Sequence, residues 1–212
     1  MVNNKDNIMK IALITLLILC FSSVAHADVF VWKDAETGIS ASFPDTWKMN
    51  NNQQPDTVLT IIGPDMQAMP ICHLRVRNDG RFKMYPSTFE SDIQKVAYDI
   101  KFWEEYLLTE YRNVEMTHEY DDAGLGRGFA SYALFNFEGE PITSHAFRQG
   151  IGFASHQYDR VYIAECLVNN KNYRTWIPHF LNFFKSIDFN TVYDKYVQGY
   201  YRDFLNKDAS EE

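Results

Sequence analysis

The sequence predicts an α+β fold, in which a single antiparallel sheet of about six to eight strands is flanked by helices in an αβα sandwich. Three observations lead to this class. Short segments alternate apolar and polar residues, a long amphipathic segment lies in the middle of the chain, and the later strand segments are joined by short connections. Short connections favour antiparallel neighbours, because a parallel crossover needs about a dozen residues or more.

The domain begins with a predicted β-hairpin. Val29 to Lys33 is its first strand, residues 36–38 are its turn, and Ile39 to Phe43 is its second strand, where apolar residues alternate with serines. The polar stretch at residues 50–54 is expected to be a surface loop.

Two more strands are predicted at Val58 to Ile62 and at Ile71 to Arg77. Successive side chains of a strand point to opposite faces, so the second strand has a core face and a face that is wet or lies under a polar element. Cys72, Leu74 and Val76 share the first face, and His73, Arg75 and Arg77 share the second.

The middle of the chain predicts one long helix from Phe89 to Tyr111. Apolar residues, Val96 among them, recur there at 3.6-residue spacing, which gives the helix a face to lay on the sheet. Ser87, with Glu90 three residues later, is typical of a capping box at the start of a helix. Asn113 marks the expected end.

Four further strand segments follow this helix. The breakers between them include an acidic turn at Asp121 to Gly124 and a short connection at Ser155-His156. The segments are Val114 to Tyr120, Gly128 to Phe137, Ile142 to Phe153 and Tyr158 to Val168.

A helix from Tyr173 to Phe184 is predicted to close the domain, which spans residues 28–189. A proline, Pro178, lies within this segment, where it would remove a backbone hydrogen bond. The proline is tolerated if Thr175 caps the helix, because Pro178 then falls in the first turn.

Residues 1–27 have the order of a cleavable secretory signal. Two lysines precede an apolar run from Ile11 to Phe21, and the small-residue box Ala25-His26-Ala27 follows it. The competing interpretation is a membrane anchor, but this run is far shorter than the roughly 20 residues that cross a bilayer. Cleavage before Asp28 therefore predicts a periplasmic or secreted protein, and no later stretch is long and apolar enough to span a membrane.

The net charge and the number of cysteines indicate which partners are excluded and whether a disulfide forms. The chain has a formal net charge of −8, which argues against a nucleic-acid partner, because phosphate binding needs a basic surface. Removal of the signal takes Cys20 away and leaves Cys72 and Cys166, and an even number of cysteines in an oxidising compartment favours a disulfide. The alternative is two buried, unpaired thiols on separate strands.

Three segments carry a resemblance to a known family. They are the run Gly38-Ile-Ser-Ala-Ser-Phe-Pro-Asp-Thr-Trp47, the hairpin Phe147-Arg-Gln-Gly150 to Tyr162-Ile-Ala-Glu-Cys166, and the helix that leads into Phe184-Lys-Ser-Ile-Asp-Phe189. On these residues the chain resembles the Mog1/PsbP-like family of small exported bacterial proteins. The resemblance implies an antiparallel sheet flanked by helices and a role in binding or assembly. It carries no catalytic or ligand residue over to this chain.

No sequence motif selects an active site or a cofactor. Histidines and carboxylates lack HxH, HxxH or HExxH spacing, so a metal site would have to be assembled across strands. His118, Asp121 and Asp122 are the densest group and the weak candidates for a metal site. They also mark the alternative function, a metal-dependent or hydrolytic enzyme with His145 or His156 nearby. The favoured interpretation is a solvated acidic turn, which predicts no cofactor and no enzymatic activity.

Residues 190–212 predict a C-terminal amphipathic helix with an acidic tail. Its apolar stripe is rich in aromatic residues, which suit a contact surface because they combine a large apolar area with a polar tip. Binding of a protein partner or self-association is expected through Tyr193, Tyr196, Tyr200, Tyr201 and Phe204. The alternative is that the same stripe packs on the chain's own sheet. The sequence as a whole predicts an exported, non-enzymatic protein that acts by binding.

Overall fold

The structure is a computed structural model that describes residues 28–51, 55–86, 89–138 and 147–189 of the chain. The strands are β1 (Val29–Asp34), β2 (Ile39–Pro44), β3 (Lys48–Asn51), β4 (Thr57–Ile62), β5 (Ile71–Asn78), β6 (Glu115–Leu125), β7 (Gly128–Glu138), β8 (Phe147–Gln157), β9 (Arg160–Asn169) and β10 (Asp188–Phe189). The helices are α2 (Glu90–Ala97), α3 (Ile100–Glu110) and α4 (Tyr173–Ser186), and the short 3₁₀ turns are η1 (Gly80–Phe82) and η3 (Asn170–Asn172).

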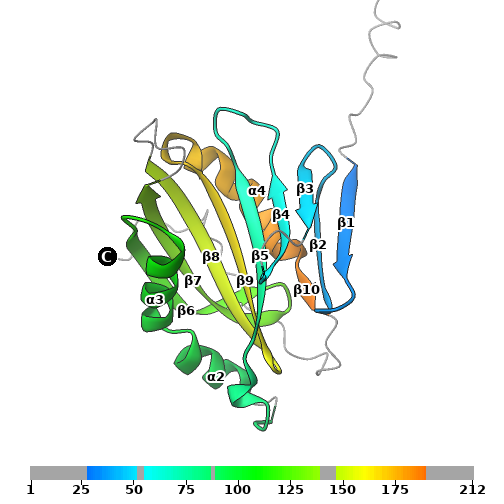
Figure 1. Cartoon of the computed structure of the whole chain (residues 1–212), viewed down its shortest axis with the longest axis vertical. Coiled ribbons are helices and arrows are strands. Elements are labelled where there is room, and N and C mark those ends of the chain that lie inside the picture. The colour runs from blue at the N-terminus through cyan, green and yellow to red at the C-terminus, as the bar shows by residue number, and fades with distance from the viewer. Residues whose placement is uncertain (1–27, 52–54, 87–88, 139–146, 190–212) are drawn as a thin grey trace, which may run out of the picture.

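The predicted fold class is confirmed: the described residues form an α+β fold whose main sheet is antiparallel. This sheet has seven strands in the order β3-β4-β5-β9-β8-β7-β6 (Figure 1). The predicted hairpin is present, but it belongs to a second sheet of three strands in the order β1-β2-β10. The hairpin stands apart because β10, which follows α4, pairs with the free side of β2.

Helices cover both faces of the large sheet, and each face has its own hydrophobic core. On one face α3 buries Trp103 among strand residues such as Phe135. On the other face α4 and the small sheet bury Phe184 and Ile39, and the ring of Phe184 lies 4.7 Å from that of Phe153 on β8. Figure 1 shows α2 and α3 on one side of the sheet and α4 on the other.

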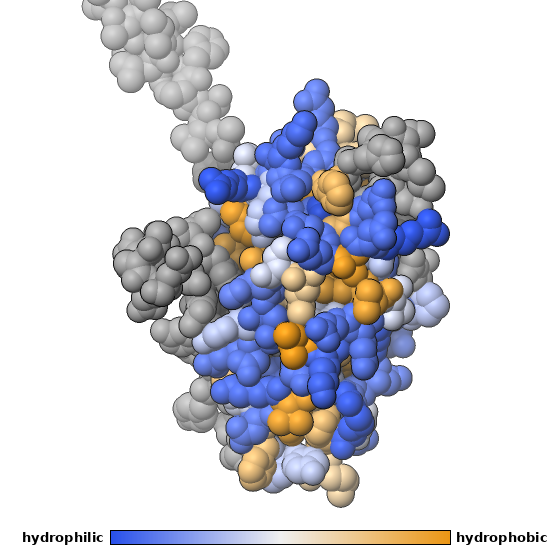
Figure 2. Space-filling model, turned by 90° about the vertical axis from the view of Figure 1, so that its left-hand side faces the viewer, coloured by the Kyte–Doolittle hydropathy of each residue, from blue (hydrophilic) through white to orange (hydrophobic). Residues whose placement is uncertain are grey.

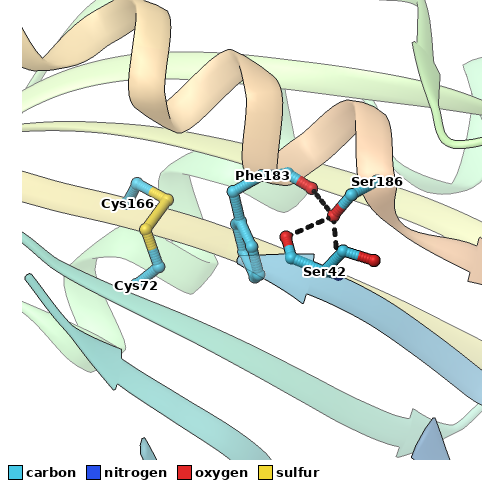
Figure 3. Close-up of a disulfide and its surroundings, with 5 residues drawn as sticks. All are labelled: Ser42, Cys72, Cys166, Phe183 and Ser186. Carbon is cyan, nitrogen blue, oxygen red and sulfur yellow. Dashed lines mark hydrogen bonds between the residues drawn. A yellow bond between two sulfur atoms is a disulfide. The ribbon is translucent and has the colours of Figure 1, made fainter. Parts of the chain in front are cut away.

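The predicted disulfide is present in the centre of the large sheet. Cys72 on β5 lies directly opposite Cys166 on β9, with their Cα atoms 4.0 Å apart, and both side chains are fully buried. Figure 3 shows the bridge beneath α4, near Phe183. In the same view the Ser186 hydroxyl accepts a hydrogen bond of 2.8 Å from the backbone N–H of Ser42, which ties the end of α4 to β2.

The single helix predicted from Phe89 to Tyr111 is wrong, because the chain breaks into α2 and α3 at Tyr98 and Asp99. The Asp99 carboxylate accepts hydrogen bonds from two backbone amides of α3 and so starts a new helix. Apolar spacing continues across this break, which is why periodicity alone missed it. Phe89 precedes α2 without a side-chain cap, and the predicted cap Ser87 lies outside the described residues.

The break also turns α2 away from its predicted orientation. Val96, expected on the buried face, is 75% exposed, whereas Gln94 is 1% exposed. The polar Gln94 is therefore buried on the side of α2 where the apolar pattern predicted residues such as Val96.

The start of α4 also differs from the prediction. The helix follows η3 directly and begins at Tyr173, so Thr175 is not its cap and Pro178 lies inside the helix. The proline forfeits one backbone hydrogen bond there. The helix keeps its path because Phe180 and Trp176 are buried on its inner face, and the Trp176 ring lies 5.8 Å from that of Trp47.

Three predicted loops are partly strand in the structure. Asn50 and Asn51, expected in a loop, pair with β4 as part of β3. The predicted acidic turn at residues 121–124 lies within β6, where a register shift between Tyr120 and Ala123 marks a bulge rather than a break. The predicted connection at Ser155-His156 is strand as well, because β8 pairs with β9 up to Gln157.

The polar face predicted for β5 is confirmed, and α3 is the element that covers it. Arg75 and Arg77 lie 2.6 and 2.8 Å from the two carboxylate oxygens of Glu110 at the end of α3. The fully buried Glu165 on β9 accepts a hydrogen bond of 3.1 Å from the Tyr111 hydroxyl. This network holds the end of α3 to the sheet.

None of the helices in the described ranges is long and apolar enough to cross a membrane. The predicted signal at residues 1–27 and the predicted C-terminal helix at residues 190–212 lie outside these ranges, so both stay predictions.

Candidate functional site: a polar pocket at the end of β8

The residues that the sequence grouped as a weak metal site all lie on one strand. His118, Asp121 and Asp122 are exposed on β6, at the edge of the large sheet. His118 lies level with Ile151 of β8 across β7, so His156 is about 17 Å further along that strand. In the described part of the chain, no three His, Cys, Asp or Glu side chains are grouped so that they could hold a metal ion. His145 lies outside that part.

A cavity of about 220 Å³ lies instead at the end of β8. Its walls come from η1 and the segment after it, from α2, and from the turn between β8 and β9. Figure 1 shows how the chain passes from β5 into α2 at this end of the sheet. The lining residues are Phe82, Lys83, Tyr85, Pro86, Glu90, Ile93, His156, Gln157 and Tyr158.

The pocket lies where the backbone pairing of two neighbouring strands of the sheet ends. The pairing of β7 with β8 ends at Ser131 and Ala154, whereas β8 continues to Gln157. The Gln94 side chain of α2 enters the gap and replaces a strand: its amide nitrogen donates to the Ala154 carbonyl over 3.0 Å, and its oxygen accepts from the His156 N–H over 2.9 Å. These bonds satisfy the Ala154 carbonyl and the His156 N–H, which no strand pairs with here. The last residues of β8, His156 and Gln157, line the cavity.

Asp79 organises the wall formed by η1. Its carboxylate accepts two hydrogen bonds from the Arg81 guanidinium, at 2.8 and 2.7 Å, and a further one from the Tyr98 hydroxyl. The hydrogen bonds from Arg81 hold the pKa of Asp79 well below its ordinary value, with a smaller contribution from Tyr98. This carboxylate is therefore ionised and fully engaged within the protein.

The His156 side chain is likewise committed to the structure. Its Nε2 atom lies 3.3 Å from the Asp79 carbonyl, which can only accept, so Nε2 carries the proton. The imidazole packs between Tyr98, with ring centroids 6.0 Å apart, and Phe82, at 5.6 Å. Burial lowers the pKa of His156, so the ring is neutral at pH 7.

Glu90 is a lining residue with a buried polar atom that has no hydrogen-bond partner in the described ranges. Among the described residues its Oε1 atom is buried and has no hydrogen-bond partner. Burial raises the pKa of Glu90 to about 7, and the nearby Gln157 amide offsets only part of this effect. The Gln157 side chain donates its own hydrogen bond of 3.1 Å to Ser155. Buried polar groups normally have partners, so the Glu90 carboxyl group has hydrogen-bonding capacity that the described residues do not fill.

Two cations lie near the pocket, and each has a carboxylate beside it, although Asp159 is shared between Lys83 and Arg160. Arg81 pairs with Asp79 at 2.7 Å, and Lys83 lies 3.9 Å from Asp159. Both also stack on aromatic rings, with the Arg81 guanidinium 5.2 Å from the centre of the Phe82 ring and the Lys83 ammonium 5.1 Å from that of Tyr158. No ion pair in the described ranges joins either cation to Glu90.

The surface around α2 and α3 offers no broad apolar patch. Figure 2 shows this side of the molecule as largely hydrophilic, with apolar side chains in small, separate groups. A second cavity of about 270 Å³ lies between the small sheet and α4. Its lining is mostly apolar, with Phe43, Trp47 and Phe183 among its residues, and nothing there selects a ligand by charge.

The sequence does not predict the pocket. It places Glu90 in a capping box, and no motif marks Gln94 or Gln157. A usable signal was present: Glu90 and Gln94 are four residues apart and share one face of a helix. These two polar residues share a helix face with Ile93, which indicates that this face packs on polar groups as well as apolar ones.

The comparisons with known proteins bear on the fold. Neither a protein-family model nor a curated protein matches the sequence. Among solved structures, CyanoP, the PsbP protein of Synechocystis sp. PCC 6803, is 9% identical with a TM-score of 0.49, over 79% of this chain and 96% of CyanoP.

Two other solved structures are similar to the same extent. LpqN of Mycobacterium tuberculosis, described as involved in cell envelope biogenesis, is 11% identical with a TM-score of 0.48, over 76% of this chain and 90% of LpqN. The Ran-binding protein Mog1p of Saccharomyces cerevisiae is 9% identical with a TM-score of 0.47, over 77% of this chain and 96% of Mog1p. These similarities concern the fold alone.

Proposed function

We propose that this chain is an exported, non-enzymatic protein that binds a group of a partner protein in the pocket at the end of β8. The observation that carries the proposal is the unpaired, buried Oε1 atom of Glu90 in a cavity whose other hydrogen-bonding groups are largely engaged. A frame whose other polar groups are largely engaged suits recognition, because few of them rearrange when a ligand arrives.

The chemistry of the lining favours binding over catalysis. A general base must reach the proton it removes, and a nucleophile must have a base beside it. The Nε2 proton of His156 is held by the Asp79 carbonyl, and the ring is closed in between Tyr98 and Phe82. The imidazole therefore acts as part of the wall.

The disulfide supports export as the second part of the proposal. Cys72 and Cys166 are bonded in the core of the sheet, and such bonds persist in oxidising compartments such as the bacterial periplasm. The proposed C-terminal helix, with Tyr193, Tyr196 and Tyr200 on its aromatic stripe, would add a second contact surface for a partner or another copy.

Export is tested by cell fractionation and by the mass of the mature protein. The expected product begins at Asp28, lies in the periplasm or the medium, and gains the mass of two hydrogens on reduction. A product that retains residues 1–27 in the cytoplasm would contradict export.

Partner binding is tested by photo-crosslinking in cells, with a photoreactive residue in place of the exposed Lys83 at the rim. One crosslinked protein is expected, which Glu90→Gln removes and Asp92→Asn retains. Asp92 is the matched control, because it is an exposed carboxylate on the same helix. The same capture after truncation behind Phe189 measures the contribution of residues 190–212. Tightly held metal in the purified protein, lost on His118→Ala, would instead support the enzyme alternative.

A further inference from the structure

We infer that the pocket takes a protonated amine on a short aliphatic chain, such as the end of a lysine side chain of the partner. This inference rests on the proposed binding role and specifies its ligand class. Three features of the pocket lead to it: its size, a carboxyl group with no cation beside it in the described ranges, and its aromatic walls.

The size fits one side chain. Pockets for drug-sized ligands measure about 300 to 1,000 Å³, whereas this cavity has about 220 Å³. Apolar atoms of Ile93, Pro86 and Tyr85 line part of it and suit a short methylene chain. The polar end of the ligand then meets Glu90.

The charge arrangement favours a cation. Asp79 has Arg81 beside it and Asp159 has both Lys83 and Arg160, whereas Glu90 has no ion-pair partner in the described ranges. A buried carboxylate is expensive without a partner, and an ammonium group compensates it more fully than a neutral donor does. An anionic ligand would face the same carboxylate without compensation.

The aromatic walls add a second source of affinity. Rings attract cations to their faces, and the stacking of Arg81 on Phe82 and Lys83 on Tyr158 shows that rings at this site already do so. Tyr85, which is also part of the lining and 59% exposed, has no such cation among the described residues. An ammonium group that reaches Glu90 past Tyr85 would be held by both the carboxylate and the ring.

The groups around Glu90 determine how the affinity for an ammonium ion depends on pH. His156 is neutral, Gln157 is uncharged, and Lys83 is paired with Asp159, so the charge of the pocket at pH 7 to 8 depends on Glu90 itself. Binding of an ammonium ion favours the ionised carboxyl group and releases its proton. Affinity is therefore expected to rise between pH 6 and 8.

The test uses the mature protein, from Asp28 to the C-terminus, and NMR titration at pH 8 with three probes of similar size: n-butylammonium, n-butanol and butyrate. Butylammonium is expected to shift the amide signals of α2 and of the β8–β9 turn, and to bind at least about tenfold more tightly than the other two. Glu90→Gln is expected to weaken butylammonium binding about tenfold or more. Asp92→Asn is expected to leave it unchanged.

Lys83→Met tests whether the chain's own ammonium group competes for Glu90. Equal or tighter binding of butylammonium supports the inference, because Lys83 is not part of the recognition. Weaker binding contradicts it. The spectrum of Glu90→Gln, compared with that of the wild type, shows directly whether the variant is folded.

Three results would overturn the inference: equal affinity for butanol and butylammonium, retention of affinity in a folded Glu90→Gln protein, or signal changes away from the pocket. If the crosslinked partner still depends on Glu90 while butylammonium does not bind, the proposed function stands and only the ligand class is wrong.

Discussion

Removal of the disulfide is expected to destabilise the protein strongly without changing its fold. Cys72 and Cys166 are 94 residues apart in the sequence, and a bridge that closes a loop of about 100 residues restricts the unfolded chain by about 4.7 kcal/mol. The double variant Cys72→Ala/Cys166→Ala should therefore lose about 4.5 kcal/mol of unfolding free energy. The native pairing of β5 with β9 should persist, because the backbone ladder runs from Ile71 to Asn78 on both sides of the bridge.

The assay is urea unfolding followed by circular dichroism. With a denaturant slope of about 2 kcal/mol per molar urea, the midpoint should fall by about 2 M. The wild type in a reductant is the control, since it should unfold near the midpoint of the double variant. A loss below about 1 kcal/mol, or a wild-type midpoint that reductant does not move, would refute the argument from loop closure.

Three further predictions concern single residues. Gly126→Ala should cost about 2 to 4 kcal/mol of stability in thermal melts, because Gly126 has a φ of 56° and a Cβ there would overlap the Ile187 carbonyl. Gly80→Ala, where a Cβ meets nothing within 4 Å, should change stability by less than about 0.5 kcal/mol. Trp103→Phe should cost about 2 to 4 kcal/mol in urea unfolding, because it loses buried volume and the hydrogen bond from the indole to Ser131; an unchanged midpoint would contradict this. Burial raises the pKa of Glu90 from 4.5 to about 7, so the native state holds a proton that the unfolded chain releases, and stability should fall as the pH rises through this window. Glu90→Gln should flatten that fall in melts at pH 5, 6, 7 and 8, and a wild-type slope in the variant would exclude Glu90 as its source.

Sequence reasoning predicted the sheet well because strand patterns are local. Alternation along Ile71 to Arg77 indicated which side chains share a face, and the structure places Cys72 and Leu74 in one core and Arg75 beneath α3. The disulfide partner followed from the cysteine count, because only one other cysteine remains after residue 27.

Periodicity predicted the helices less well. It reports that a segment has an apolar stripe, but a continuous stripe does not reveal where the backbone turns. At Tyr98 a long-range hydrogen bond to Asp79, together with the cap from Asp99, ends α2 and begins α3. Hydrogen bonds to the backbone of β8 hold Gln94 in the core, whereas Val96 is exposed.

The sequence alone could not predict the candidate site, because the residues that form it are far apart in the chain. Glu90 and Gln94 come from α2, and Gln157 comes from the end of β8, more than 60 residues later. They meet where the backbone pairing of β7 with β8 ends.

The sequence by itself determined the antiparallel strands, the paired cysteines, the acidic charge and the expectation of export, since each depends on local pattern or composition. The tertiary structure decided which polar groups are buried and which of them find partners. A hydrogen-bond donor or acceptor is satisfied by whatever the fold brings within about 3 Å of it, and this depends on strands and helices far apart in the chain. For that reason the free carboxyl oxygen of Glu90, on which the proposed binding role depends, became visible only in the folded molecule.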